Sequence, residues 1–153
     1  MNQSSSGMVA CIVPNATKAP LRAFGDEAEI LLSGADTDGK FTMWLETTPP
    51  GGGPPPHYHE NEDEWFFVLE GSPEFYVNGW TKVAPGGTVF VPKGTVHTFR
   101  NAGDSHLKML IHTSPSGFET FFASCAEEFA RSSTPDMERI LEISAKHGIY
   151  FVK

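Results

Sequence analysis

Short stretches in which apolar and polar residues alternate dominate residues 9–114 of the chain. A period of two is typical of a β-strand with one buried face. Clusters of glycine, proline, asparagine and aspartate lie between the stretches and predict tight turns, including a hairpin at Asn78-Gly79. We therefore expect strands over residues 9–13, 29–33, 40–47, 64–70, 73–77, 80–83, 88–91, 97–101 and 106–113.

The pattern changes after Pro115. Apolar residues then recur at spacings of three and four, which predicts an amphipathic helix carrying Phe118, Phe121, Phe122, Cys125 and Phe129. A second helix is predicted to start at Ser133 or Thr134, followed by Pro135 and Asp136, and to stop at Gly148. Its apolar face carries Met137, Ile140, Leu141 and Ser144 or Ala145. We interpret the phenylalanines as core residues, with a lid over a pocket as the alternative.

Length and composition agree with an all-β domain. A chain of 153 residues suffices for one domain with a substantial core. We expect a single domain over 1–153, with a barrel core at about 9–114 and a helical tail at about 116–148. The 15 glycines and 12 prolines suit many short strands joined by tight turns.

Charge and cysteine usage narrow the classes of partner. The formal net charge of −8 argues against nucleic acid or an anionic membrane, because both attract basic surfaces. Cys11 and Cys125 lie far apart, and we interpret them as reduced, mostly buried thiols. No apolar run reaches membrane-spanning length, and no signal peptide is recognisable. We therefore expect a cytoplasmic protein.

Three histidines and one glutamate form the candidate chemical site. His57 and His59 are two residues apart, so both side chains point to one face of a strand. Glu64 follows a short polar turn and can come from the neighbouring strand, whereas His97 must come from a third. Four inward-facing ligands from three strands require a barrel or a sandwich. Three imidazoles and a carboxylate make a complete ligand set for a divalent ion of Fe, Mn, Co, Ni, Cu or Zn.

The other polar groups are interpreted as structural. Three further histidines have no partner at ligand spacing, namely His106, His112 and His147. The acidic residues beside the site are interpreted as a solvated loop, namely Glu60, Glu62 and Asp63.

Two glycine-bounded motifs surround these ligands. The first consists of Gly51, His57, His59, Glu64 and Gly71, and the second of Gly86, Pro92, Gly94, His97 and Asn101. In this spacing the chain resembles the cupin superfamily. The resemblance implies a small antiparallel double-sheet jelly-roll barrel with a metal near its centre, held by the three histidines and the glutamate.

The inward position of the ligands sets the phase of their strands. If Glu64 points inward, Phe66 and Val68 do so too, and Phe99 follows His97. The opposite face of residues 64–70 carries Trp65, Phe67 and Leu69. We expect this row to pack against a second sheet, with a partner subunit as the alternative.

Among cupins, the chain is most similar to small one-domain proteins that resemble quercetin 2,3-dioxygenase. The likeness lies in residues 54–59, 64–71, 89–92 and 135–151. It implies a metal-dependent oxygenase that uses dioxygen on a phenolic or enolic small molecule, with Glu64 as ligand and general base. The side chains expected to stack on the substrate are Phe66, Phe99, Phe41 and Met43. The best-known flavonol enzymes have two cupin domains, whereas this chain has one.

Two other functions stay open at this point. A metal-dependent isomerase, cyclase or lyase would use the ion only as a Lewis acid. A non-enzymatic carrier would bind a small ligand in the barrel without turnover. Cupins of this size are often dimers, so we expect a homodimer.

Overall fold

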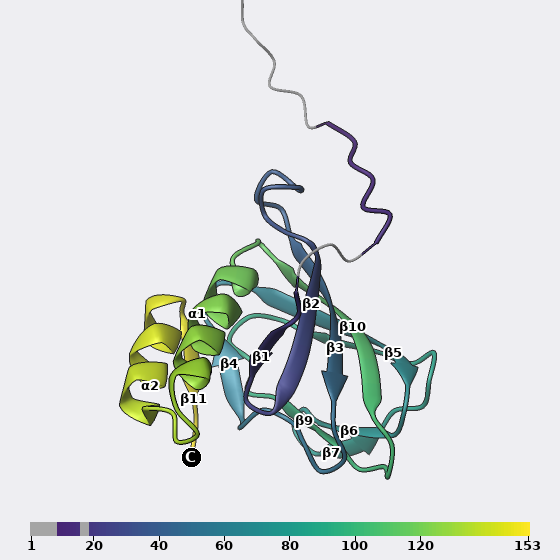
Figure 1. Cartoon of the computed structure of the whole chain (residues 1–153). Coiled ribbons are helices and arrows are strands. Elements are labelled where there is room, and N and C mark those ends of the chain that lie inside the picture. Colours follow the sequence, from purple (N-terminus) through teal and green to yellow (C-terminus); the bar gives the residue numbers. More distant parts are fainter. Residues whose placement is uncertain (1–8, 16–18) are drawn as a thin grey trace, which may run out of the picture.

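Antiparallel strands are the main regular elements of the structure, a computed structural model that describes residues 9–15 and 19–153 (Figure 1). The larger sheet has the strand order β1-β2-β3-β10-β5-β8. Its strands are β1 (Leu21–Ala23), β2 (Asp26–Leu32), β3 (Thr42–Thr48), β10 (Leu107–Ser114), β5 (Asp63–Glu70) and β8 (Thr88–Val91). The smaller sheets are β7-β6-β9 and β11-β4, made of β7 (Trp80–Lys82), β6 (Pro73–Tyr76), β9 (Thr98–Asn101), β11 (Ile149–Phe151) and β4 (His57–His59). The expected all-β jelly-roll class is confirmed.

Strands β3 and β10 show why the larger sheet has one buried face. Buried and partly exposed residues alternate along both, as a period of two requires. Trp44 pairs with Ile111, and Ile111 in turn pairs with Phe66. All three side chains are almost fully buried, so this row forms the centre of the core.

The phase of β3 corrects the sequence prediction. The buried face carries Thr42, Trp44 and Glu46, and Met43 lies on the other face. On the outer face of the sheet, the rings of Phe41 and His112 lie with their centroids 6.2 Å apart. The register with β10 decides the phase, because it places Trp44 beside buried Ile111 and carries Thr42 and Glu46 inward with it.

The first predicted strand is also wrong. Residues 9–13 form no strand, and Ile12 is 90% exposed. Cys11 is exposed as well, so only Cys125 is the expected buried thiol. The first strand is β1, which turns into β2 through Phe24 and Gly25, both at positive φ. Positive φ at both central residues is typical of a type I′ hairpin.

The outer face of β5 does not pack on a second sheet, contrary to expectation. Phe67 and Leu69 are 37% and 42% exposed. Trp65 stacks on His112 of the neighbouring strand, with ring centroids 5.0 Å apart. The predicted hairpin at Asn78-Gly79 is present between β6 and β7 with a three-residue loop, because Tyr76 pairs with Trp80.

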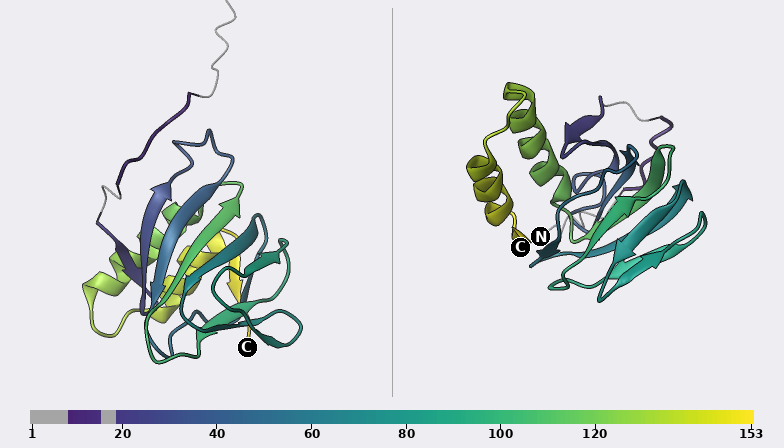
Figure 2. Two further views of the ribbon diagram at one scale, coloured as in Figure 1. Left: turned by 90° about the vertical axis from the view of Figure 1, so that its right-hand side faces the viewer. Right: turned by 90° about the horizontal axis from the view of Figure 1, so that it is seen from below.

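Two helices cover one side of the sheets (Figure 2). They are α1 (Phe118–Arg131) and α2 (Met137–Lys146). The Asp136 carboxylate caps α2 by accepting from the Glu138 and Arg139 amides. The buried face of α2 carries Ile140, Ile143 and Ser144, whereas Met137 and Leu141, which the sequence placed on this face, are half exposed. Among the described residues, no helix is long and apolar enough to cross a membrane.

Strand β11 follows the helices and was not predicted. It pairs with β4, so that Ile149 lies opposite His59 and Phe151 opposite His57. The end of the chain therefore supports the strand that carries the first two histidines.

Candidate metal centre

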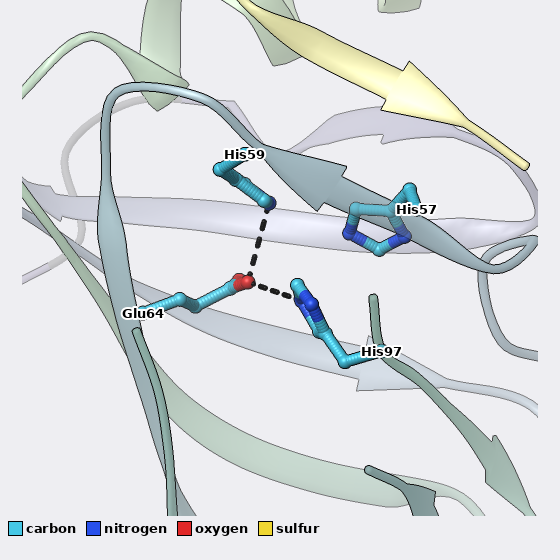
Figure 3. Close-up of side chains that lie close together, drawn as sticks. All are labelled: His57, His59, Glu64 and His97. Atoms are coloured by element: carbon cyan, nitrogen blue, oxygen red, sulfur yellow. Dashed lines mark hydrogen bonds and ion pairs between the residues drawn. The ribbon is translucent and has the colours of Figure 1, made fainter. Parts of the chain in front are cut away.

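The four predicted ligands come together inside the barrel (Figure 3). His57 and His59 lie on β4, Glu64 lies on β5, and His97 directly precedes β9. One ligand atom from each lies within 4.8 Å of the others, and all four residues are buried. The backbones of His57 and His97 also exchange two hydrogen bonds of 3.1 and 2.9 Å. This bridge fixes the second motif against the first.

Hydrogen bonds at Nδ1 orient each imidazole. Nδ1 of His57 lies 2.8 Å from the Pro55 carbonyl, and Nδ1 of His97 lies 2.9 Å from the Thr95 carbonyl. Because a carbonyl only accepts, both rings carry their proton on Nδ1 and present Nε2 to the centre. Metal-binding histidines in proteins are held in this way.

His59 is anchored by a carboxylate instead. Its Nδ1 lies 3.2 Å from Oε2 of Glu62. Its buried Nε2 has no hydrogen-bond partner within the described part of the chain, although Oε2 of Glu64 lies 3.3 Å away. An orphaned buried nitrogen aimed at a carboxylate and two further imidazoles fits a metal ion. The donor set therefore suits the divalent ion that the sequence predicts.

Glu62 corrects the interpretation of the acidic loop. It is buried rather than solvated, since it anchors His59. Neighbouring Asp63 accepts a hydrogen bond from the Lys93 amide at 2.9 Å and thereby ties β5 to the loop before His97. All three acidic residues were predicted to be solvated, but only Glu60 is exposed.

Charge interactions separate the pKa values within the site. Burial lowers the pKa of His57 to about 3, helped by the neighbouring imidazoles of His97 and His59. Burial alone would lower the pKa of His59, but the Glu64 carboxylate and the Glu62 hydrogen bond raise it to about 9. Burial alone would raise the pKa of Glu64, yet the charge of the adjacent His59, with His97 also close by, holds it well below its usual range. A metal ion at this centre requires the unprotonated form of Nε2 of His59.

An aromatic cavity adjoins the four ligands. Its volume is about 50 Å³. Phe66 and Phe99 line it, as the sequence predicted, whereas Phe41 and Met43 do not. Their exclusion follows from the phase of β3. Aromatic side chains that the sequence did not assign to the site complete the wall, namely Phe24, Trp44, Phe118, Phe121, Phe122 and Phe151.

The helical tail contributes directly to this wall. Phe118 stacks on Trp44 with ring centroids 4.1 Å apart and an interplanar angle of 8°. It also stacks on His59 at 6.1 Å. The helix is therefore both core and cavity wall, so the two interpretations of its phenylalanines are not exclusive.

Two carboxyl groups in the wall were missed by sequence analysis. Asp26 of β2 and Glu46 of β3 both line the cavity. The indole Nε1 of Trp44 donates a hydrogen bond of 2.6 Å to Oε2 of Glu46. The only signal for Glu46 was its position two residues after Trp44 on one strand face.

Comparison with known proteins identifies the fold family. Residues 44–113 match the cupin domain family. The chain carries a cupin domain. No match was found among curated proteins.

Solved structures similar to this chain include proteins with several different names. A predicted oxalate decarboxylase from Thermotoga maritima is 24% identical over 69% of this chain and 99% of its own, with a TM-score of 0.64. KdgF from Halomonas sp. is 18% identical over 73% and 99%, with a TM-score of 0.63. The polyketide cyclase RemF from Streptomyces resistomycificus is 23% identical over 71% and 81%, with a TM-score of 0.60. At these identities the likeness concerns the fold alone.

Proposed function

We propose that this cupin is a metal-dependent oxygenase that acts on a phenolic or enolic small molecule. The observation that carries the proposal is the junction of the four-ligand centre with the aromatic cavity, since all four ligands belong to the cavity wall. A divalent ion bound there would polarise a substrate oxygen and, if redox-active, would give access to dioxygen. The remaining chemistry falls to the side chains of the wall.

Glu64 is the residue we assign to proton transfer beside the ion. Its Oε2 lies 2.8 Å from Nε2 of His97 and 3.3 Å from Nε2 of His59, so the carboxylate sits among the ligand nitrogens. A hydroxyl group that enters the centre meets this carboxylate and can give up its proton to it. The flat faces of Phe66 and Phe99 supply an apolar surface for a ring.

The size of the cavity bears on the class of substrate. A volume of about 50 Å³ is smaller than the ~150 Å³ apolar cavity that holds a benzene molecule. Even a single ring must therefore displace side chains of the helical tail or of β11, and a substrate with several rings must displace more of them. We expect small enols and single-ring phenols to be better substrates than flavonols.

Oxygen uptake tests the proposal. Protein loaded in turn with Fe(II), Mn(II), Ni(II), Co(II) and Cu(II) is supplied with single-ring phenols, small enols and flavonols. We expect metal-dependent uptake with at least one compound and its loss in Glu64→Gln, with Glu60→Gln as the exposed control. No uptake by fully loaded protein across the panel would contradict an oxygenase.

A metal-dependent isomerase, cyclase or lyase is the second candidate. The observation that favours it is the presence of Asp26 and Glu46 in the wall, because non-oxidative rearrangement of a carbonyl compound needs groups that both give and take protons. Turnover under nitrogen with the Zn(II)-loaded protein would support it over the oxygenase. Tight binding of a small ligand without turnover in either gas would point to a carrier.

A further inference from the structure

Two buried carboxyl groups face the cavity from adjacent strands. Asp26 and Glu46 are only 4% and 6% exposed. Glu46 pairs with Ala28, two residues beyond Asp26, so both carboxyls project from the inner face of the sheet. Neither belongs to the group of four metal ligands.

No cation neutralises this pair among the residues that the structure describes. No salt bridge of the described chain involves Asp26 or Glu46, and Oδ1 of Asp26 makes no hydrogen bond there. The polar support for Glu46 is the indole of Trp44. Burying two anions side by side without a cation is strongly unfavourable.

The pair therefore retains a proton. Burial raises the pKa of Glu46 well above its usual range, and the adjacent Asp26 carboxylate raises it further. Burial also raises the pKa of Asp26, to about 6. The interaction between the two groups lowers the pKa of Asp26 and raises that of Glu46, so the proton resides on Glu46. At neutral pH one carboxyl is neutral and the other charged.

A purely structural role does not account for this arrangement. A core position beside Trp44 needs only one acceptor for the indole N–H, which a glutamine would provide without a charge. Asp26 leaves a buried oxygen without a hydrogen bond in the wall of the cavity, at a cost in stability. Residues that reduce stability while facing a cavity are typical of functional sites.

We propose that Glu46 and Asp26 form a second acid–base group of the cavity, which exchanges a proton with a carbon atom of a substrate held at the metal centre. The proposal rests on the part of the proposed function that places a substrate at that centre. In the step, the C–H bond next to a carbonyl breaks and its electron pair becomes the double bond of an enolate. The proton passes to the charged carboxylate of the pair, and the reverse step returns a proton to the same carbon.

Hydrogen exchange into a small ketone tests the proposal without dioxygen. Zn(II)-loaded protein is incubated under nitrogen in heavy water with hydroxyacetone, and loss of the proton signal next to the carbonyl is followed by NMR. We expect wild-type protein to accelerate exchange and Glu46→Gln to slow the protein-dependent rate about 100-fold. Asp26→Asn should also slow it, because the charged partner is lost.

The matched control is Glu128→Gln. Glu128 is a buried glutamate of α1 that pairs with Arg131 and does not line the cavity. Its variant should exchange like wild type, and the metal content of all four proteins should be equal. Exchange at the wild-type rate in Glu46→Gln, or no exchange by metal-loaded wild type, would overturn the proposal.

Infrared spectroscopy supplies a readout that does not depend on turnover. The band of a neutral carboxylic acid should be present in wild type at pH 7, absent in Glu46→Gln and retained in Glu128→Gln. Its presence in Glu46→Gln would contradict the shared proton.

The two proposals can fail separately. Hydrogen exchange by wild type without any oxygen uptake would rule out the oxygenase and leave the acid–base role of the carboxyl pair in place. If Glu46→Gln takes up oxygen and exchanges hydrogen at the same rates as wild type, the acid–base role of the carboxyl pair is removed and the oxygenase is kept.

Discussion

The cavity has two polar ends, and each contains a glutamate with a different kind of neighbour. At the metal end, Glu64 is surrounded by imidazoles, which hold its pKa low and keep it charged. At the carboxyl end, burial and the neighbouring Asp26 carboxylate raise the pKa of Glu46 well above its usual range and keep it neutral, although the hydrogen bond from the Trp44 indole acts in the opposite direction. Two buried glutamates in one cavity thus differ in charge because one faces imidazoles and the other faces a carboxylate. The comparison shows that burial does not fix the state of a carboxyl, whereas the charge of its nearest neighbour does.

The aromatic contact between the two ends should give the largest effect. Phe118 stacks on Trp44 at the carboxyl end and on His59 at the metal end. We expect Phe118→Ala to lower the free energy of unfolding by about 3 kcal/mol, because it leaves a void under α1. Urea unfolding measures it. Met137→Ala, at a half-exposed position of α2, is the control and should change stability by less than about 0.5 kcal/mol. Equal changes in the free energy of unfolding for the two substitutions would contradict the packing role of Phe118 between Trp44 and His59.

The carboxyl end should respond to pH in a defined direction. The pKa of Asp26 is raised from 3.8 to about 6, so the folded protein holds this proton more tightly than the unfolded chain. The contribution of the protonated Asp26 carboxyl to stability is therefore complete below about pH 4 and is lost as the pH rises through about 6. Asp26→Asn should be more stable than wild type at pH 7, by up to about 3 kcal/mol, and should show no gain at pH 4. Asp104→Asn, at an exposed position, is the control. A gain of equal size at both pH values would refute the raised pKa.

The metal end should respond to loss of its anchoring carboxylate. Glu62→Gln weakens the support at Nδ1 of His59 without touching a ligand. We expect the dissociation constant for the metal to rise about 10- to 100-fold, or about 1.4–2.7 kcal/mol. Competition with a chromogenic chelator measures it, and Glu60→Gln serves as the exposed control. An unchanged constant would mean that His59 is oriented by β4 alone.

The outer face of β5 should affect neither end. We propose that the chain forms a homodimer through this face, where Phe67 and Leu69 are exposed and Phe90 of the edge strand β8 is 61% exposed. Phe67→Lys should convert the dimer to a monomer in sedimentation experiments while the metal content stays the same. Leu141→Lys on α2 should leave the dimer intact. A monomeric wild type would contradict the proposed dimer.

The two ends also differ in how far the sequence predicts them. The metal end could be predicted because its ligands lie in two short motifs whose spacing fixes their direction on a strand. The carboxyl end could not, because Asp26 and Glu46 are brought together by the register between β2 and β3. Sequence analysis gave the inner face of this strand to Phe41 and Met43, since the alternating pattern of residues 40–47 is equally compatible with either phase.

Other parts of the fold show the same limit. The strands and both helices were predicted where a periodic pattern extends over several turns or pleats. Strand β11 is only three residues long, which is too short for a period to be recognised, although it holds β4 in place. Residues 9–13 have a strand-like composition but no partner strand in the structure, and composition alone does not supply one.

The metal content of the purified protein tests the account most directly. Wild type and His57→Ala, purified without added metal or chelating resin, are compared by mass spectrometry. We predict close to one equivalent of a transition metal in wild type and less than about a tenth of that in the variant, because His57 is one of the four candidate ligands among the described residues. Absence of metal from both proteins, even after reconstitution, would contradict the metal centre and with it both proposed enzymatic functions.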